Sequence, residues 1–158
     1  MKEIKLTQGK FALVDNDMFE ELNQFKWCAA KDGNTFYAVR NIYNNRKRKT
    51  IRMHRQILGL IDSKIQCDHK NHEGLDNQKS NLRSCTIAEN QRNQRPRIGC
   101  SSKYKGVYFN KLCKKWMAYI KVENKSTTIG LFTNEIEAAK AYDKAAKVHH
   151  KEFAYTNF

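Results

Sequence analysis

The stretch Gln66-Cys67-Asp68-His69-Lys70-Asn71 places a carboxylate and an imidazole side by side near the middle of the chain. Amide side chains return at Asn81 and Asn90, which follow His69 by 12 and 21 positions (81 − 69 and 90 − 69). Neighbouring residues in a strand point to opposite faces, so Asp68 and His69 can share a site only where the strand bends or ends. We therefore expect a strand that ends at this pair, with a helix carrying Asn90 crossing beneath it.

These side chains suit one kind of chemistry. Hydrolysis of a phosphodiester needs a base for the attacking water and a cation for the charge on the leaving oxygen. A neutral imidazole such as His69 accepts a proton near pH 7 without a large change of pKa. The oxygens of Asp68 and Asn90 suit Mg²⁺ or Mn²⁺ rather than zinc. A polar hairpin with an unremarkable Asp-His pair is the alternative, and both asparagines at these offsets in a basic chain argue against it.

The charge of the chain indicates a polyanionic partner. Its 158 residues include 30 Lys and Arg against 16 Asp and Glu, a formal net charge of +14, which favours nucleic acid or an anionic membrane. No apolar run approaches the ~18 residues that span a bilayer, and the first residues lack the apolar core of a signal peptide. We therefore expect an intracellular protein whose partner is nucleic acid; neither a membrane nor a protein partner is indicated.

The only proline, Pro96, lies in a polar and basic segment that ends in small residues. We interpret residues 96–102 as a linker between an N-terminal domain at 1–95 and a C-terminal domain at 103–158. In the N-terminal domain, β-branched and aromatic content and helical spacing predict strands at 10–14, 35–40 and 49–53, a helix capped by Asn16 or Asp17, and a short helix at 54–60.

The C-terminal domain has a clearer pattern. Three strand-like runs at 104–110, 116–123 and 126–132 precede a helix for which Thr133 is the expected N-cap. Helical spacing predicts one buried, alanine-rich face of this helix, made of Ile136, Ala139, Tyr142, Asp143 and Ala146. The expected fold class is therefore α+β.

Three parts of the chain together resemble the ββα-metal motif of HNH endonucleases, in the variant with asparagine in place of the last histidine. They are Asp68-His69, the segment with Asn77 and Asn81-Leu82-Arg83, and Glu89-Asn90. Met53-His54-Arg55 is similar to the lead-in of the phage and bacterial homing-type branch. The resemblance implies a small ββα-metal nuclease domain with N-terminal strands, in which His69 is the general base and Asp68 and Asn90 bind one divalent cation. It also implies that Asn81 is structural and holds the loop over the active site. The remaining histidines are interpreted as solvated or structural; these are His54, His72, His149 and His150. His54 is the first candidate for another role, because Arg55 lies beside it.

Five segments of the C-terminal domain look like the APETALA2/ethylene-response-factor DNA-binding domain of plant transcription factors. They are Tyr104-Lys105-Gly106-Val107, residues 115–120, Ile129-Gly130-Leu131-Phe132, residues 137–146 and Thr156-Asn157-Phe158. This resemblance implies a three-stranded antiparallel sheet packed on one helix, with the sheet in the major groove. The DNA-facing positions carried over are Lys105, Tyr108, Asn110, Lys115, Tyr119, Lys121, Ser126 and Thr128. Several of these places hold arginine or tryptophan in plant members, so fewer bidentate guanine contacts are available and a guanine-rich target is not implied. Trp116 and Phe132 are expected in the core.

A run of four positive charges, Arg46-Lys47-Arg48-Lys49, lies between two strand-like segments. One interpretation is a solvated turn. The other is a hairpin that grips phosphates with Arg46, Lys47 and Arg48, where each neutralised phosphate adds ~0.9 to the salt slope of binding. Such contacts contribute affinity without sequence preference.

Together these patterns and the two resemblances predict a site-specific endonuclease of the homing or mobile-element type that cuts double-stranded DNA with Mg²⁺ or Mn²⁺ and a histidine base. We expect it in the cytoplasm of a bacterium or a phage-infected host cell. The alternative is a non-catalytic DNA-binding regulator with a degenerate nuclease fold, although a regulator has no need to keep Asp68, His69 and Asn90 together. An RNA-binding basic protein fits the charge but gains nothing from the motifs. The target sequence, the choice between a nick and a double-strand cut, and the oligomeric state stay open.

Overall fold

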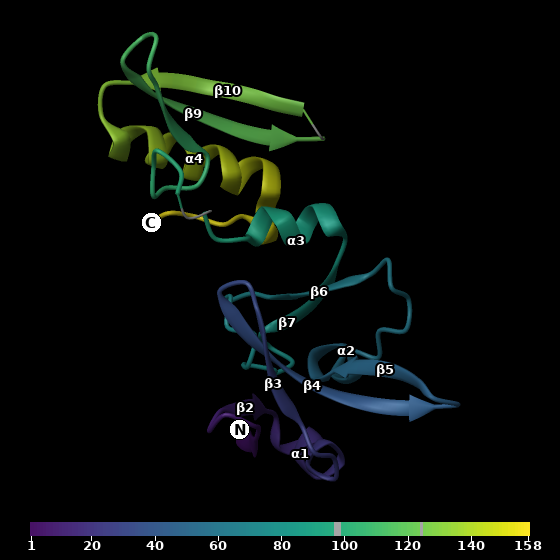
Figure 1. The fold of residues 1–158 in the computed structure, drawn as a ribbon. Coiled ribbons are helices and arrows are strands. Elements are labelled where there is room, and N and C mark those ends of the chain that lie inside the picture. The colour runs from purple at the N-terminus through teal and green to yellow at the C-terminus, as the bar shows by residue number, and fades with distance from the viewer. Residues whose placement is uncertain (97–98, 124) are drawn as a thin grey trace. The chain divides into compact units, whose positions relative to one another are not determined.

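A computed structural model describes residues 1–96, 99–123 and 125–158 and divides the chain into two compact units, Met1–Asn90 and Gln91–Phe158 (Figure 1). Each unit is considered by itself. Of the linker predicted at 96–102, residues 97–98 lie outside the described part of the chain. The α+β class is confirmed, because small antiparallel sheets and four α-helices alternate along the chain. No helix within the described ranges has the length and apolar character required to cross a membrane.

Three small antiparallel sheets build the N-terminal unit. The first pairs β1 (Lys2–Lys5) with β2 (Phe11–Val14). The second has the order β3-β4-β5, and the third is the β6-β7 hairpin. The bounds of these strands are β3 Cys28–Asp32, β4 Thr35–Asn44, β5 Lys47–Arg52, β6 Gln66–His69 and β7 Leu82–Cys85. The helices are α1 Asn16–Asn23, α2 Met53–Ile57 and α3 Ile87–Asn93, of which the last runs across the boundary between the units.

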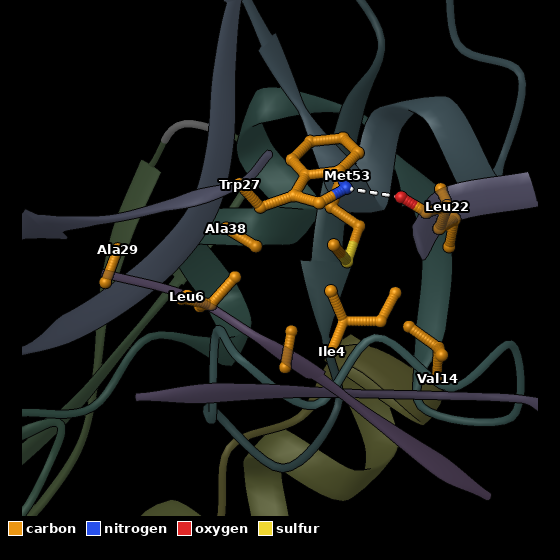
Figure 2. Close-up of a cluster of buried hydrophobic side chains, with 9 residues drawn as sticks. Ile4, Leu6, Val14, Leu22, Trp27, Ala29, Ala38 and Met53 are labelled. Atoms are coloured by element: carbon orange, nitrogen blue, oxygen red, sulfur yellow. Dashed lines mark hydrogen bonds between the residues drawn. The ribbon is translucent and has the colours of Figure 1, made fainter. Parts of the chain in front are cut away.

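The core of the N-terminal unit joins the first two sheets to α1 and α2 (Figure 2). Alternation in β2 sends Ala12 and Val14 inward, and they pack with Leu22 of α1 and Met53 of α2, all fully buried. The buried indole of Trp27 donates its N–H to the Leu22 carbonyl oxygen at 2.8 Å, so the end of α1 is tied to the start of β3. Burial of these side chains drives the packing of segments that are far apart in the sequence.

Three local predictions in this unit were displaced by a few residues. Asp15, rather than Asn16 or Asp17, is the N-cap of α1, and its carboxylate instead accepts from the backbone N–H of Lys79 at 2.7 Å. The strand predicted at 49–53 ends at Arg52, because Met53 already begins α2 and is fully buried. The helix predicted at 54–60 ends at Ile57.

The C-terminal unit is a three-stranded antiparallel sheet of order β10-β9-β8 with one long helix. Its elements are β8 Val107–Asn110, β9 Lys115–Val122, β10 Lys125–Phe132, α4 Glu135–His150 and the short 3-10 helix Lys151–Phe153. Small residues let α4 lie close to the sheet: Ala138, Ala139 and Ala146 are fully buried together with Ala118 of β9. Trp116 and Phe132 pack against this core, as predicted.

Two predictions for α4 were wrong. Asn134, not Thr133, is the N-cap, because its side-chain oxygen accepts from the backbone N–H of Ile136 at 2.7 Å. Ile136 itself is 44% exposed, so the buried face begins at Ala138. His150 is buried and its Nε2 lies 3.0 Å from the Lys121 carbonyl oxygen, which is a structural position, whereas His149 is exposed.

A buried carboxylate holds the end of the chain against the start of the sheet. Asp143 accepts from the backbone N–H groups of Asn157 and Phe158 at 2.8 to 3.0 Å. The Asn157 side chain in turn accepts from the backbone N–H of Lys105 at 2.8 Å. Hydrogen bonds to a charged acceptor are among the stronger ones in proteins. The bonds through Asp143 and Asn157 therefore hold the backbone at Lys105, just before β8 begins.

We expect Gly106→Ala to destabilise the C-terminal unit. Gly106 has a φ of 73°, and a Cβ there would overlap the Tyr142 ring, so backbone strain and overpacking add to about 1–3 kcal/mol or more. Gly99→Ala is the matched control, because Gly99 has a φ of 87° but a Cβ there meets no described atom within 4 Å. Denaturant unfolding of both variants measures the difference; equal losses would show that the Tyr142 contact contributes nothing.

Candidate active site

Asp68 and His69 lie at the end of β6, where a strand end was expected. In the β6-β7 hairpin Asp68 faces Arg83 and His69 faces Leu82. Both side chains are buried, with 5% and 6% of their surface exposed. Buried polar groups require partners, and each of these residues has a different one.

The partner of Asp68 is Arg83 on the neighbouring strand. The Arg83 Nε and Nη2 atoms lie 2.8 and 2.6 Å from Asp68 Oδ2, and the guanidinium is itself largely buried. A planar guanidinium offers two donors to one carboxylate, which makes this a strong, directional pair. The negative charge of Asp68 is thereby kept inside the protein with its counter-charge beside it.

The partner of His69 is Asn77, a residue that is only 1% exposed. The Asn77 Nδ2 group donates to the Leu75 carbonyl oxygen at 3.2 Å, which turns its Oδ1 toward His69 Nε2, 3.3 Å away. An amide oxygen can only accept, so the Nε2 atom carries the proton and Nδ1 is the basic nitrogen of the neutral ring. This contact selects one tautomer of His69.

Burial lowers the pKa of His69 below its ordinary value of 6.5, while the Asn77 hydrogen bond and the nearby Asp68 charge act in the opposite direction. Desolvation disfavours the charged imidazolium, and the anionic neighbour favours it. The net direction is downward, so His69 is neutral at pH 7. A neutral imidazole is the form that accepts a proton.

Asn77 is positioned by a strand remote in sequence. The Leu13 N–H donates to the Leu75 carbonyl at 2.9 Å, and the Asn77 N–H donates to the Leu13 carbonyl at 2.8 Å, so β2 anchors the segment that carries Asn77. The same segment lies against β4: Gly74 donates its N–H to the Thr35 hydroxyl at 3.1 Å, and a Cβ at Gly74 would overlap the Tyr37 ring. Asn77, which orients the His69 ring, is therefore held by the N-terminal sheets.

Two aromatic rings enclose the His69 imidazole. The His54 ring lies 5.1 Å from it at an interplanar angle of 89°, and the Tyr37 ring lies 5.7 Å from it and 5.4 Å from His54. Burial lowers the pKa of His54 to about 3, so this ring is neutral, and its Nδ1 has no hydrogen-bond partner among the described residues. His54 was singled out in the sequence through the neighbouring Arg55 and the resemblance of Met53-His54-Arg55 to a family segment, and nothing there indicated Tyr37.

Asn81 holds the loop that follows the Asp-His pair. Its Oδ1 accepts from the backbone N–H of Asn71 at 3.0 Å, and its Nδ2 donates to Asn71 Oδ1 at 2.9 Å and to the Asp76 carbonyl at 2.8 Å. The backbone carbonyl of Asn81 also accepts from the Lys70 N–H at 2.9 Å. These contacts use both Nδ2 donors and bind Oδ1 to the backbone, which suits the structural role that the resemblance implies.

Asn90 lies in α3, the helix that follows β7, and is half-buried. The start of α3 is fixed by a capping box in which Glu89 Oε2 accepts from the Thr86 N–H at 2.8 Å and Thr86 Oγ1 accepts from the Glu89 N–H at 3.2 Å. None of the hydrogen bonds between described residues joins Asn90 to Asp68. The described residues also contain no group of three or more His, Cys, Asp or Glu side chains placed to hold a metal ion.

The predicted DNA-facing residues of the C-terminal unit divide into two groups. Strand register places seven on the sheet face opposite α4, with pairs Asn110↔Lys115, Tyr119↔Thr128 and Lys121↔Ser126, and with Tyr108 opposite Met117. Met117, which was not predicted, lies at the centre of this face, where its sulfur is 2.7 Å from the Tyr108 hydroxyl. Lys105 is elsewhere: its ammonium donates to three backbone carbonyls at the end of α3, those of Gln91, Arg92 and Gln94, at 2.6 to 3.1 Å.

We expect the N-terminal unit to lose stability in acid because of His54. Its pKa is about 3 when folded and near 6.5 when unfolded, so the unfolded chain binds a proton that the folded one does not, and stability falls as the pH drops from 6.5 toward 3. The loss is at most about 1.4 kcal/mol per pH unit. Unfolding at pH 7 and pH 5 should show a smaller pH effect in His54→Phe than in the parent. The control His72→Asn, at a partly exposed histidine, should keep the parent's pH effect; an unchanged slope in His54→Phe would contradict the assignment.

Comparison with known proteins places this geometry in context. The chain is 33% identical over 156 residues to an uncharacterized HNH endonuclease of Acanthamoeba polyphaga mimivirus, covering 95% of this chain and 76% of that protein. Shorter stretches are similar to plant proteins: 48% identity over 42 residues to an ethylene-responsive transcription factor-like protein of Arabidopsis thaliana, and 43% over 60 residues to APETALA2-like protein 2 of Oryza sativa. These stretches cover 27% and 37% of this chain and only 18% and 14% of the plant proteins. No protein-family model matches the chain. The length and identity of the match to the viral protein show that the chain belongs to the HNH endonuclease family.

Proposed function

We propose that this protein is a site-specific DNA endonuclease of the homing or mobile-element type, in which β6, β7 and α3 form a ββα-metal site. The observation that carries the proposal is the arrangement at the end of β6. There a buried Asp68 keeps its charge beside Arg83, and a neutral His69 is held in one tautomer by Asn77. A buried acid next to an oriented imidazole supports a hydrolytic role for the pair.

His69 acts as the general base through Nδ1. Because Asn77 Oδ1 accepts the Nε2 proton, Nδ1 is left with its lone pair and can take a proton from water. When His69 becomes an imidazolium, the Nε2–H bond to Asn77 and the nearby Asp68 charge both stabilise it. The rings of Tyr37 and His54 limit rotation of His69, so the proton acceptor is oriented before substrate arrives.

Asp68 and Asn90 are the residues that would hold a divalent cation, each through a side-chain oxygen. The donor set fits such an ion in its chemistry, since one carboxylate and one neutral amide are hard ligands that leave room for phosphate and water, as Mg²⁺ or Mn²⁺ prefers. When bound, the cation supplies charge stabilisation at the leaving oxygen. Arg83 fixes the orientation of the Asp68 carboxylate, and Asn81 holds the loop beside it.

In this proposal the C-terminal unit selects the DNA site. The exposed sheet face brings hydroxyl, amide and ammonium groups together on one side of the sheet, and short stretches of the chain are similar to APETALA2-type proteins. A one-metal nuclease site touches mainly phosphates, which carry no direct sequence information, so a second element must supply it. Lys105 supports this unit from within, because its ammonium stabilises carbonyls at the end of α3.

We expect His69→Ala to abolish divalent-metal-dependent nicking of plasmid DNA while DNA binding is retained. The loss should be at least 10²-fold, because the general base is removed without changing the charge of the surface. His149→Ala, at an exposed position of α4, is the control and should cut like the parent. Chelation by EDTA should stop cutting in both active proteins. If His69→Ala cuts as well as the parent, the base assignment is wrong.

We also expect the sheet face to determine where the protein cuts. Tyr119→Ala and Lys121→Ala, made together in the full chain, should broaden the set of cleaved sequences by roughly tenfold or more per lost contact. Lys144→Ala, which removes one charge on the exposed side of α4, is the control and should keep the parent's preference. Sequencing the ends produced from random DNA gives the measurement. Identical preference in the double variant and the parent would exclude the sheet as the specificity element.

A further inference from the structure

The β4-β5 hairpin extends past the rest of the N-terminal unit (Figure 1). Ala38 of β4 lies in the core, but every residue from 41 to 50 is exposed, so both faces of this part of the hairpin lie in water. A two-stranded ribbon with both faces in water is marginally stable by itself. Core packing therefore does not explain why these strands continue for four residue pairs beyond Arg40.

The ribbon formed by residues 41–50 has a charge that suits one kind of partner. It contains four positive side chains and no acid, and none of the four forms an ion pair with a described residue. The tip is the two-residue turn Asn45-Arg46, with φ values of 47° and 63°, as in a type I′ turn. Such a turn fixes the register of the strands, so the order of side chains along the ribbon is fixed as well.

The register separates the ribbon into two chemically different faces. One face contains the cross-strand pairs Asn41↔Thr50 and Tyr43↔Arg48. The other contains Ile42↔Lys49 and Asn44↔Lys47. Residues directly opposite each other in an antiparallel pair share a face, and neighbours along a strand do not. The first face thus carries the arginine together with a tyrosine, an amide and a hydroxyl, and the second carries both lysine ammoniums, which are point charges, beside Ile42 and the amide of Asn44.

We propose that the face made by Asn41, Tyr43, Arg48 and Thr50 reads bases in the major groove of duplex DNA. This inference deepens the proposed endonuclease function and rests on it, by assigning sequence recognition to the nuclease unit as well. The major groove, about 12 Å wide, admits a two-stranded ribbon. In it Arg48 pairs with the O6 and N7 acceptors of guanine and Asn41 pairs with adenine.

The contacts on this face favour recognition over simple phosphate binding. The Thr50 hydroxyl donates to Asn41 Oδ1 at 2.9 Å, which orients the amide and leaves its Nδ2 donors and the second lone pair of Oδ1 for a base. Tyr43 is 72% exposed beside Arg48, where it can pack against the groove wall. The two pairs on the face are two residues apart, about 6.8 Å, which is about two base-pair steps. We therefore expect preference at two positions separated by two base pairs.

The lysines of the opposite face have the complementary task. Lys47 and Lys49 neutralise phosphates as the ribbon enters the groove, which strengthens binding to all sequences equally. This proposal differs from the prediction made from charge alone, in which the ribbon binds only phosphates. Here the lysine face supplies affinity for any DNA, and the Arg48 face supplies preference for particular bases.

The test uses the full chain in the His69→Ala background, so that binding is measured without cutting. Arg48→Lys keeps the charge but removes the planar fork, and should lower the preference at one base position by about tenfold with little change in the salt slope. Lys49→Ala is the matched control on the other face; it should weaken binding to every sequence and reduce the salt slope by about 0.9. Selection from random duplex DNA, followed by sequencing, measures the preference, and titration at several salt concentrations measures the slope.

Unchanged base preference in Arg48→Lys and in Arg48→Ala would overturn the proposal, as would tighter binding to single-stranded DNA or RNA than to duplex. Both positions are exposed, so thermal unfolding of each variant should match that of its parent. The two proposals fail separately. If the parent never cuts DNA but Arg48→Lys changes the selected site, the endonuclease proposal fails and the ribbon assignment stands. If the parent cuts and neither Arg48 variant changes preference, only the ribbon assignment fails.

Discussion

The buried pair of Asp68 and Arg83 is the constraint on which the candidate site depends. A carboxylate with 5% exposure is costly to ionise unless a counter-charge is beside it. Arg83 meets that requirement from the opposite strand, at 2.6 and 2.8 Å. A shift of β7 by one residue would send the guanidinium to the other face of the hairpin, so the pair also specifies the register. That register places Leu82 opposite His69 and the neighbouring Asn81 at the base of the loop.

The orientation of His69 depends on a different part of the chain. Asn77 can fix its tautomer because β2 holds the backbone on either side through Leu13. Tyr37 from β4 and His54 from α2 complete the enclosure. The N-terminal sheets therefore do more than bury a core: they orient the His69 ring, which a short β6-β7 hairpin could not do alone.

In both units the surfaces proposed to meet DNA are exposed faces of antiparallel strands. An antiparallel sheet can bury one face and leave the other in water, with the side chains ordered by register. In the C-terminal unit this leaves Tyr119 and Lys121 on the face opposite α4. In the N-terminal unit the ribbon beyond Arg40 exposes both faces, and alternation separates Arg48 from Lys47 and Lys49. In the ribbon, the alternation of side chains along each strand thus separates the residues proposed to read bases from those proposed to bind phosphates.

Much of this could be predicted from the sequence because the signals are local. Alternation and turn residues located most strands, and helical spacing located α4, with errors at caps such as Asn134 where two polar residues compete. The strand end at Asp68 and His69 followed from the need for both to serve one site. Lys105 was expected to contact DNA only through the APETALA2 resemblance, and nothing in the sequence indicated that its ammonium lies on backbone carbonyls at the end of α3.

The sequence by itself determined the α+β class, the polyanion-binding charge and the presence of an acid beside a base. The tertiary structure alone decided that Arg83 compensates Asp68 and that Asn77, Tyr37 and His54 surround His69. The reason is physical: alternation and capping act over a few residues and leave a trace in the sequence, whereas burial brings together side chains from β4, α2 and the segment before β7. Desolvation in that shared interior, and not any one motif, lowers the pKa of His69 and favours its neutral form.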